Sequence, residues 1–262
     1  MAIALGAVGT ALAADGAFVA IDGGMLITGD RDGDANEVES EVEIQPFRLM
    51  RHEVTNRAFA AFVDETGHIT DPERHGAGYV WNGRWQRIEG ADWRHPFGPG
   101  SDIAGKADHP VIQVSKNDAE AFCAHFGWRL PTEEEWEFAA RGEDHRRYPW
   151  GDTPPQQSTG EMPRANFGAE RCCAADATDG YEKTAPVGRY PAGAGPFGHL
   201  DLAGNVWEWT SSRFPGRPEH AVIRGGGWGN DPYALRAAYR HGNPDDYGLD
   251  MVGFRCSETL VP

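Results

Sequence analysis

The chain has few cysteines, no pair of them in a C-x-x-C spacing, and no long apolar run. Only Cys123, Cys172, Cys173 and Cys256 occur among its 262 residues. Without a C-x-x-C pair, a zinc ribbon or a thioredoxin-like redox site is disfavoured. No apolar run approaches the roughly 18 residues that a membrane-spanning helix requires. We therefore expect no insertion into a membrane.

Basic residues are also scarce. The chain carries 24 Lys and Arg against 40 Asp and Glu, a formal net charge of −16. Proteins that hold nucleic acid or anionic lipid independently of sequence need clustered Lys and Arg. We therefore expect no nucleic-acid partner. The apolar fraction of 40% and the 9 tryptophans predict a globular protein with a substantial core.

Glycine and proline, in contrast, are abundant. The 34 glycines and 18 prolines make up about a fifth of the chain, where average usage is nearer to about an eighth. This composition predicts a fold rich in turns and loops. No repeat, low-complexity tract or linker marks a boundary, so we expect a single domain over residues 17–262.

The first 15 residues form a short apolar stretch that contains Ala11-Leu12-Ala13. This pattern is typical of the apolar region and small-residue cleavage site of a secretory signal, although the usual charged start is missing. The alternative is a buried N-terminal strand or helix. We favour a signal-peptide remnant over residues 1–15, and export would permit disulfides.

Three helices are predicted by their capping residues and apolar spacing. After Thr55, the segment 56–64 places Phe59, Phe62 and Val63 on one face, and Gly67 follows as a stop. A second helix starts after Ser115 and ends at Gly127. The third opens with a capping box over Thr132–Glu135 and extends to Ala140. Short strands are expected at Phe18–Ile21 and Val222–Ile223.

A long insertion between Gly67 and Pro110 is rich in aromatic and turn residues, among them Tyr79, Trp81, Trp85 and Trp93. Long loops without secondary structure of their own are usually functional or mobile. Alternatively, these aromatic side chains seal a core that has little helix and sheet. For most of the tryptophans we predict the core.

Eight motifs, in order along residues 17–257, resemble those of the formylglycine-generating enzyme superfamily. They are Glu53–Asn56, Asp108–Ser115, Arg129–Gly142, Tyr148–Asp152, Thr184–Gly188, Phe197–Thr210, Arg224–Trp228 and Gly253–Cys256. The resemblance implies an α+β fold, related to C-type lectins, with little regular secondary structure. It also implies a structural disulfide between Cys123 and Cys256. Cys172 and Cys173 are left open, as two thiols or a vicinal disulfide.

The resemblance further implies two structural calcium sites. In the first, Asn166 and Asp179 give side-chain oxygens, and Phe167 and Tyr181 give backbone carbonyls. The second consists of Asp201, Gly204, Val206 and Glu208, with Asp201 and Glu208 as the carboxylates. Calcium takes six to eight such oxygen ligands. Alternatively, Asn166 and Asp179 only cap turns, and Asn205 and Glu208 bind buried backbone.

A third acidic stretch, Asp30–Asp34, is superficially similar to an EF-hand loop. It lacks the glycine that such a loop needs at the sixth position. We interpret it as a solvated loop.

The chain departs from the superfamily's enzymes where they bind metal. Asn230 and Leu235 stand at the positions of the two copper-binding cysteines, and Gly227 replaces a serine. Copper(I) selects soft thiolate ligands, so we expect no copper and no sulfatase activation by that mechanism. A second branch holds iron with three histidines. No two of the 10 histidines here lie three or four apart, so none can share a helix face as ligands.

The remaining likeness is to an exported, periplasmic branch without these thiols. That branch is associated with siderophore maturation, in which dihydropyoverdine is oxidised to the pyoverdine chromophore. It implies a peptide siderophore precursor as substrate and other periplasmic maturation proteins as partners. The redox cofactor is unknown. The alternative is a non-catalytic, lectin-like binding or accessory protein of the same superfamily.

Oxidation of a catechol-fused ring requires a flat aromatic pocket and a base. The superfamily's pocket position implies Trp228 and Tyr233 as stacking residues, Asn230 as a hydrogen-bonding residue and His241 as the proton acceptor. A surface-loop position for His241 and a core position for Trp207 are the structural alternatives.

Overall fold

The computed structural model describes residues 18–155, 163–169 and 172–260. The expected signal segment, residues 1–15, lies outside the described residues. The helices are α2 (Asn56–Thr66), α3 (Asp71–His75), α4 (Lys116–His125), α5 (Glu133–Arg141) and the short η1 (Pro191–Gly193). No helix among these described ranges is both long and apolar enough to cross a membrane.

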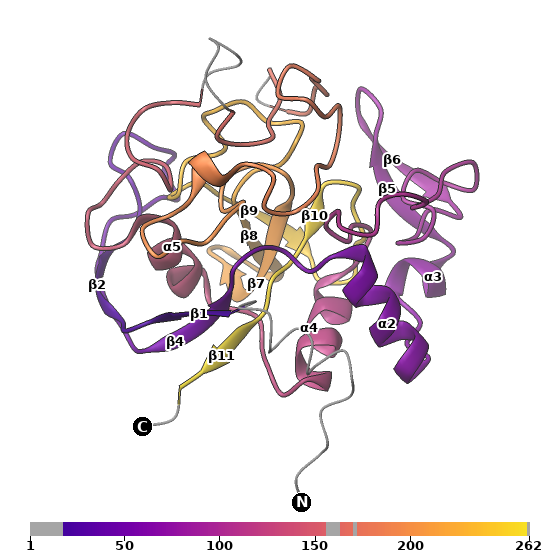
Figure 1. Cartoon of the computed structure of the whole chain (residues 1–262), viewed down its shortest axis with the longest axis horizontal. Helices are drawn as coiled ribbons and strands as arrows, with labels where there is room; N and C mark the ends of the chain where they lie inside the picture. The colour runs from indigo at the N-terminus through magenta and orange to yellow at the C-terminus, as the bar shows by residue number, and fades with distance from the viewer. Residues whose placement is uncertain (1–17, 156–162, 170–171, 261–262) are drawn as a thin grey trace, which may run out of the picture.

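The described strands form four small sheets (Figure 1). The largest has the order β10 (Val252–Gly253), β7 (Trp207–Phe214), β8 (Arg217–Arg224) and β9 (Arg240–Pro244). A second contains β1 (Phe18–Ile21), β4 (Phe47–Met50) and β11 (Ser257–Thr259). Two hairpins pair β2 (Gly24–Ile27) with β3 (Glu41–Ile44), and β5 (Ala77–Trp81) with β6 (Trp85–Glu89). Few helices and several small sheets, joined by long irregular segments, confirm the predicted α+β fold.

The three predicted helices are present, and their caps explain where they begin. The Thr55 hydroxyl accepts a hydrogen bond from the backbone of Ala58, and α2 ends at Gly67 in a left-handed conformation. Ser115 caps α4 and Thr132 caps α5, each in a reciprocal capping box. Helix α4 ends at His125, slightly earlier than predicted, because Phe126 rather than Gly127 forms its C-cap.

The insertion between Gly67 and Pro110 is more regular than the sequence predicts. It contains the five-residue α3, capped by Thr70, and the β5–β6 hairpin. A helix of five residues is too short to show an apolar period, which is why the pattern missed it. Trp93 is buried in the main core, whereas Trp81 is half-buried and Trp85 is exposed.

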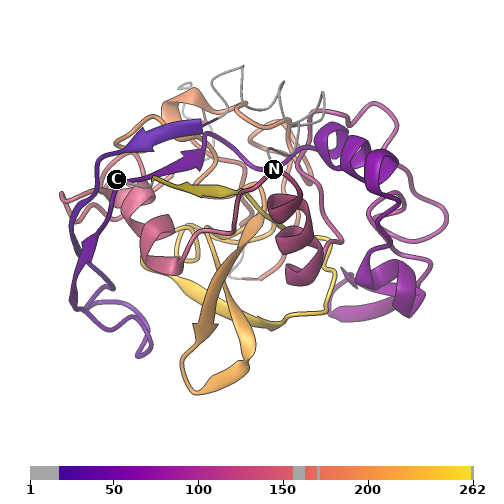
Figure 2. The same cartoon turned by 90° about the horizontal axis from the view of Figure 1, so that it is seen from below.

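The four-stranded sheet brings together segments far apart in the sequence. β7 and β8 form a long antiparallel hairpin that extends away from the rest of the molecule (Figure 2). β10 runs parallel to the start of β7, with Val252 opposite Trp207. β9 pairs with β8 and places His241 opposite Ile223. The start of β7, the start of β9 and β10 therefore lie together at one end of the sheet.

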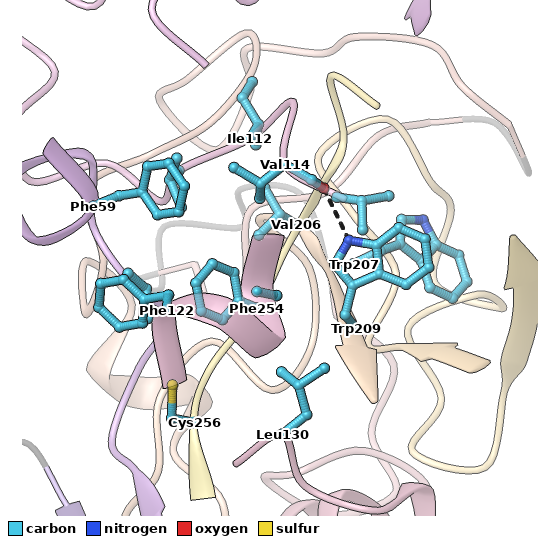
Figure 3. Close-up of a cluster of buried hydrophobic side chains, with 14 of the residues drawn as sticks. Phe59, Ile112, Val114, Phe122, Leu130, Val206, Trp207, Trp209, Phe254 and Cys256 are labelled. Carbon is cyan, nitrogen blue, oxygen red and sulfur yellow. Dashed lines mark hydrogen bonds between the residues drawn. The ribbon is translucent and has the colours of Figure 1, made fainter. Parts of the chain in front are cut away.

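The main core lies between α2, α4 and this sheet (Figure 3). The rings of Phe59, Phe122 and Phe254 contact one another, with centroid separations of 5.3 to 6.4 Å. The indole nitrogen of Trp209 donates to the carbonyl of Val114 at 3.0 Å. The predicted disulfide between Cys123 and Cys256 is present and joins α4 to the segment before β11.

Candidate functional site

A ring-sized cavity opens at the end of the four-stranded sheet where β7, β9 and β10 meet. Its volume is about 130 Å³. The wall is largely aromatic and apolar, with amide, imidazole and sulfur groups at a few positions. It is formed by Trp85, Cys172, Cys173, Trp207, Ile223, Asn230, Tyr239, His241, Asn243, Leu249, Met251 and Val252. Such a wall suits a flat, partly polar ligand.

Asn230 holds one aromatic wall of this cavity in place. Its side-chain oxygen accepts hydrogen bonds from the indole nitrogen of Trp207 at 2.9 Å and from the backbone of Gly227 at 3.1 Å. The residue is only 4% exposed. Asn230 therefore orients the Trp207 ring, and a ligand in the cavity would meet a fixed indole face.

His241 lies on β9 with its ring 6.3 Å from that of Trp207, measured between centroids. It lies on a strand rather than in a loop, but it is exposed, so the surface position of the structural alternative holds. Desolvation by the surrounding groups lowers its pKa below the usual 6.5, and the neighbouring His220 and Arg217 lower it further. At neutral pH the ring is therefore unprotonated and able to accept a proton.

Trp228 and Tyr233, the two other predicted site residues, do not line this cavity. Trp228 is 1% exposed within the core, and its indole nitrogen donates to the carbonyl of Asp250 at 3.3 Å. The Tyr233 hydroxyl donates to Asp34 at 2.8 Å, and the Arg236 guanidinium lies 4.0 Å from the Tyr233 ring centroid. The structure thus brings Asn230 and His241 together and directs Trp228 and Tyr233 elsewhere.

Several wall residues were missed or assigned otherwise by the sequence. Trp207, a superfamily pocket position with a core position as its alternative, is largely buried, and its ring also forms the cavity wall beside Tyr239. Met251 enters the wall from the segment before β10. Leu235, at the second cysteine position of the superfamily enzymes, is instead packed in a separate core cluster with Phe167. These wall residues come together through the pairing of strands that are far apart in the sequence, which the sequence pattern alone does not show.

A second, wider hollow adjoins the cavity. Its volume is about 550 Å³, and its lining includes Trp81, Asn82, Gly83, Ala174, Ala175, Lys183 and Trp228. Cys172 and Cys173 line both spaces. They are joined by a vicinal disulfide, which decides between the two alternatives left open by the sequence.

Asp250 is a buried carboxylate beneath this second hollow. One of its oxygens accepts from the backbone of Trp81 at 3.2 Å, and the other has no hydrogen-bond partner among the described residues. Burial raises the pKa of Asp250 to about 7. The positive charge of the nearby Lys183 lowers this pKa but offsets only part of the effect of burial. Burial likewise lowers the pKa of Lys183. Burial therefore favours the protonated form of the Asp250 carboxyl near neutral pH.

Replacing Asp250 by asparagine is expected to flatten the pH dependence of stability. The pKa is about 7 in the folded protein and 3.8 in the reference state, so the folded state binds the proton more tightly. Stability from this group is therefore full at low pH and is lost as pH rises toward 7. Between about pH 4 and pH 8, wild type should lose about 2–4 kcal/mol relative to Asp250→Asn. Urea unfolding of both proteins measures this difference, and parallel pH profiles would contradict it.

The first predicted calcium set has the chemistry that a cation would need. The Asp179 carboxylate accepts from the backbones of Phe167 at 2.8 Å and Tyr181 at 3.0 Å. The side-chain oxygen of Asn166 is buried without a hydrogen-bond partner in the described part of the chain. Burial raises the pKa of Asp179 to about 6. An orphaned amide oxygen and a desolvated carboxylate fit a hard cation.

The second predicted set does not fit a calcium ion. Both oxygens of Glu208 are bound by Arg255, at 2.6 and 2.7 Å, and the Trp136 indole donates to one of them. Val206 is packed in the main core. Asp201 accepts from the backbone of Gly188 at 2.5 Å. Across the described residues, no group of three or more His, Cys, Asp or Glu side chains is arranged to hold a metal.

Asp201 lies beside a carboxyl group that the sequence did not place in either set. Burial and the charge of Asp201 raise the pKa of Glu53 well above its usual range. Burial also raises the pKa of Asp201 to about 6. Three buried carboxyls, Glu53, Asp201 and Glu208, thus lie near the guanidinium of Arg255, and burial favours the protonated form of Glu53.

The chain is similar to a family model and to curated proteins over most of its length. The family model of the sulfatase-modifying factor enzyme 1-like domain matches residues 8–260. Inactive C-alpha-formylglycine-generating enzyme 2 of Mus musculus is 36% identical over 278 residues, covering 94% of this chain and 87% of that protein. Formylglycine-generating enzyme of Streptomyces coelicolor is 38% identical over 286 residues, covering 91% and 88%.

A similar solved structure is that of PvdO from Pseudomonas aeruginosa. It aligns with a TM-score of 0.68 at 25% identity, covering 93% of this chain and 94% of the other. The sequence matches confirm the superfamily resemblance of the motifs, and the structural match supports the fold. Activity differs among the similar proteins, since one of them is named as inactive.

Proposed function

Because this chain belongs to the sulfatase-modifying factor enzyme 1-like family, we propose that it oxidises a small aromatic ring system rather than a protein thiol. The substrate class is a peptide siderophore precursor with a catechol-fused ring, of which dihydropyoverdine is the concrete case. The family includes enzymes that use dioxygen, and PvdO is a structural neighbour. The observation that carries the proposal is the aromatic cavity beside Asn230, where the superfamily's enzymes have a thiol.

The size of the cavity limits what it can admit. A protein cavity of about 150 Å³ binds benzene, so a volume of about 130 Å³ admits roughly one six-membered ring. The rest of a peptide substrate would lie in the adjoining hollow of about 550 Å³. The Trp207 ring would stack on the catechol, and Tyr239 would contact its edge.

His241 would serve as the base. Removal of two electrons from the ring system also releases protons, and a neutral imidazole at the cavity wall can accept one of them. Oxidation should therefore persist at neutral pH and decline only below the usual histidine pKa of 6.5, since that of His241 is lowered. Export to the periplasm, with other maturation proteins as partners, is part of this proposal.

Loss of His241 should slow oxidation without unfolding the protein. Purified protein with defined metal content is incubated with dihydropyoverdine, and the fluorescence of the product is followed. His241→Gln should lower the rate about 100-fold, because general bases contribute factors of about 100 or more. His75→Gln, at an exposed position of α3, is the matched control and should retain the full rate.

The same assay decides whether the protein is an enzyme at all. No acceleration over buffer by wild type would contradict the oxidase proposal. A full rate in His241→Gln would instead contradict only the role of His241. Asn230→Ala should also lower the rate, because Trp207 loses the hydrogen bond that orients its ring.

A non-catalytic binding protein is the second candidate function. It is supported by the absence of a thiol at Asn230 and Leu235 and by the similar protein that is named as inactive. This candidate predicts that the precursor binds, quenching tryptophan fluorescence through Trp207, but is released unchanged. Binding without turnover, in air and with metals supplied, would establish it over the oxidase.

We also propose that Asn166 and Asp179 hold a structural calcium ion, with backbone carbonyls of Phe167 and Tyr181. The ion would neutralise a carboxylate whose pKa is raised by burial and would supply the missing partner of the Asn166 oxygen. It would thereby connect the segment around Asn166 with the turn at Asp179.

Calcium should therefore raise the melting temperature. A ligand at about 100 times its Kd stabilises by about 2.7 kcal/mol, which is about 5–10 °C for a domain of this size. Millimolar calcium should give such a shift with wild type and with Asp102→Asn, a control in an exposed turn. Asn166→Ala should abolish the shift. An unchanged melting temperature of wild type with calcium and with chelator would contradict the site.

A further inference from the structure

The Cys172–Cys173 disulfide forms the wall shared by the cavity and the wider hollow. The two residues differ in exposure: Cys172 is exposed, whereas Cys173 is 4% exposed and packs into the main core. A molecule in either space can therefore approach Cys172, while Cys173 is shielded behind it. The other bridge, Cys123–Cys256, is fully buried and lines neither space.

Close backbone packing holds this pair beside Asn230. A Cβ atom at Gly229 would lie only 3.0 Å from the carbonyl carbon of Cys173, and one at Gly168 would lie 2.4 Å from the oxygen of Ala174. The backbone of Gly168 donates to the carbonyl of Asn230 at 2.8 Å. Two glycines thus allow the cysteine segment to lie directly against the loop that carries Asn230.

The disulfide differs chemically from the rest of the wall. The other described residues lining the two spaces carry aromatic, amide, imidazole, amine, thioether or aliphatic groups. Among those residues, the disulfide is the group that accepts a pair of electrons by ordinary protein chemistry. It is also the group that both spaces expose to a ligand.

We propose that the Cys172–Cys173 disulfide is the two-electron acceptor for oxidation of the bound ring system. This inference rests on the proposed function. A catechol hydroxyl of the substrate loses its proton as a ring carbon bonds to the sulfur of Cys172; the S–S bond breaks, and Cys173 leaves as a thiolate that takes up this proton. Loss of a proton from the adjacent ring atom then forms the new double bond and breaks the carbon–sulfur bond, releasing Cys172 as a thiolate.

The electrons and protons of this reaction are accounted for by groups in the site and by dioxygen. The substrate loses two electrons and two protons, and the disulfide becomes two thiols. His241, on the same wall, receives the proton lost from the ring before it reaches a thiolate. Dioxygen then reoxidises the two thiols to the disulfide and is reduced to hydrogen peroxide.

A single turnover without air tests this directly. Oxidised wild-type protein is mixed anaerobically with dihydropyoverdine, and product fluorescence is measured. The protein is then alkylated with iodoacetamide and analysed by peptide mass spectrometry. We expect one equivalent of product per protein and alkylation of Cys172 and Cys173, with Cys123 and Cys256 unmodified. Admission of air should restart turnover.

Two proteins that lack the Cys172–Cys173 disulfide, one by mutation and one by chemical modification, test the electron transfer independently. Cys172→Ser/Cys173→Ser should give no product anaerobically and at least a 100-fold slower rate in air. Wild type reduced with dithiothreitol and alkylated at Cys172 should behave in the same way. Melting curves of both show whether they are folded.

The outcomes separate this inference from the proposed function. Aerobic oxidation that persists in the folded double variant, or that occurs with no anaerobic turnover by wild type, overturns the disulfide as acceptor and leaves the oxidase intact. Failure of wild type to oxidise the precursor under either condition overturns both. One molecule of anaerobic product for each pair of new thiols on Cys172 and Cys173 establishes the acceptor.

Discussion

Replacing Arg255 by methionine is expected to lower the free energy of unfolding by about 3–5 kcal/mol, because removing one partner leaves a buried charge uncompensated. Arg255 and Glu208 are essentially fully buried. Methionine fills much of the same volume but gives Glu208 no donor in place of the guanidinium. Urea unfolding monitored by tryptophan fluorescence measures the effect.

The size of this effect follows from how completely the guanidinium is used. Two hydrogen bonds join it to the Glu208 carboxylate. Three more bind the backbone carbonyls of Met50, Arg51 and Leu200. All five N–H donors of the side chain therefore form hydrogen bonds. Through them Arg255 connects β7, the end of β4 and the loop before Asp201. Lysine cannot reproduce this fork, and Arg255→Lys should also be strongly destabilising.

Two further variants make the interpretation specific. In Arg255→Met/Glu208→Leu, both charges are absent, and a substantial part of the lost stability should return. Arg57→Met removes the exposed ion pair with Asp108 and should change stability by less than about 1 kcal/mol. If Arg255→Met unfolded like Arg57→Met, the proposed importance of the buried pair would be wrong.

Removing the Cys123–Cys256 bridge should give an effect of similar size. The cysteines are 133 residues apart in the sequence, and a bridge that closes a loop of about 100 residues is worth about 4.7 kcal/mol in the loop-entropy model. Cys123→Ala/Cys256→Ala should therefore lose about 4–5 kcal/mol and melt about 8–20 °C lower. Differential scanning calorimetry provides the measurement.

The second disulfide provides a matched control. Cys172 and Cys173 are adjacent, so their bond closes almost no chain and restricts the unfolded state little. Cys172→Ser/Cys173→Ser should therefore melt close to wild type. If the two double variants were destabilised equally, loop closure would not be the reason that the long-range bridge matters.

Local signals were sufficient for part of the fold. Thr55, Ser115 and Thr132 begin helices because each side chain satisfies backbone donors within its own first turn. These interactions involve neighbours in sequence and are visible without a structure. The hairpin of β5 and β6 was missed because its two strands and its turn lie in an aromatic, irregular segment whose pattern has no clear period.

The site was only partly predictable, and the loop around Trp228 shows why. Gly225 and Gly226 both adopt positive φ, at 98° and 71°. After two such residues, neither the alternation of a strand nor the period of a helix tells which way the next side chain points. Trp228 consequently enters the core, while Asn230 reaches the cavity.

Residue types and their order along the chain were enough to identify the family, the capped helices and the absence of the two thiols of the superfamily's enzymes. These properties depend on residue identity and on spacing along the chain. The folded structure was needed to show that Trp207, Asn230 and His241 share one cavity, that Glu208 faces Arg255, and that the adjacent cysteines lie in the cavity wall. Each of these contacts joins segments far apart in sequence, through strand pairing and backbone packing that no local pattern records.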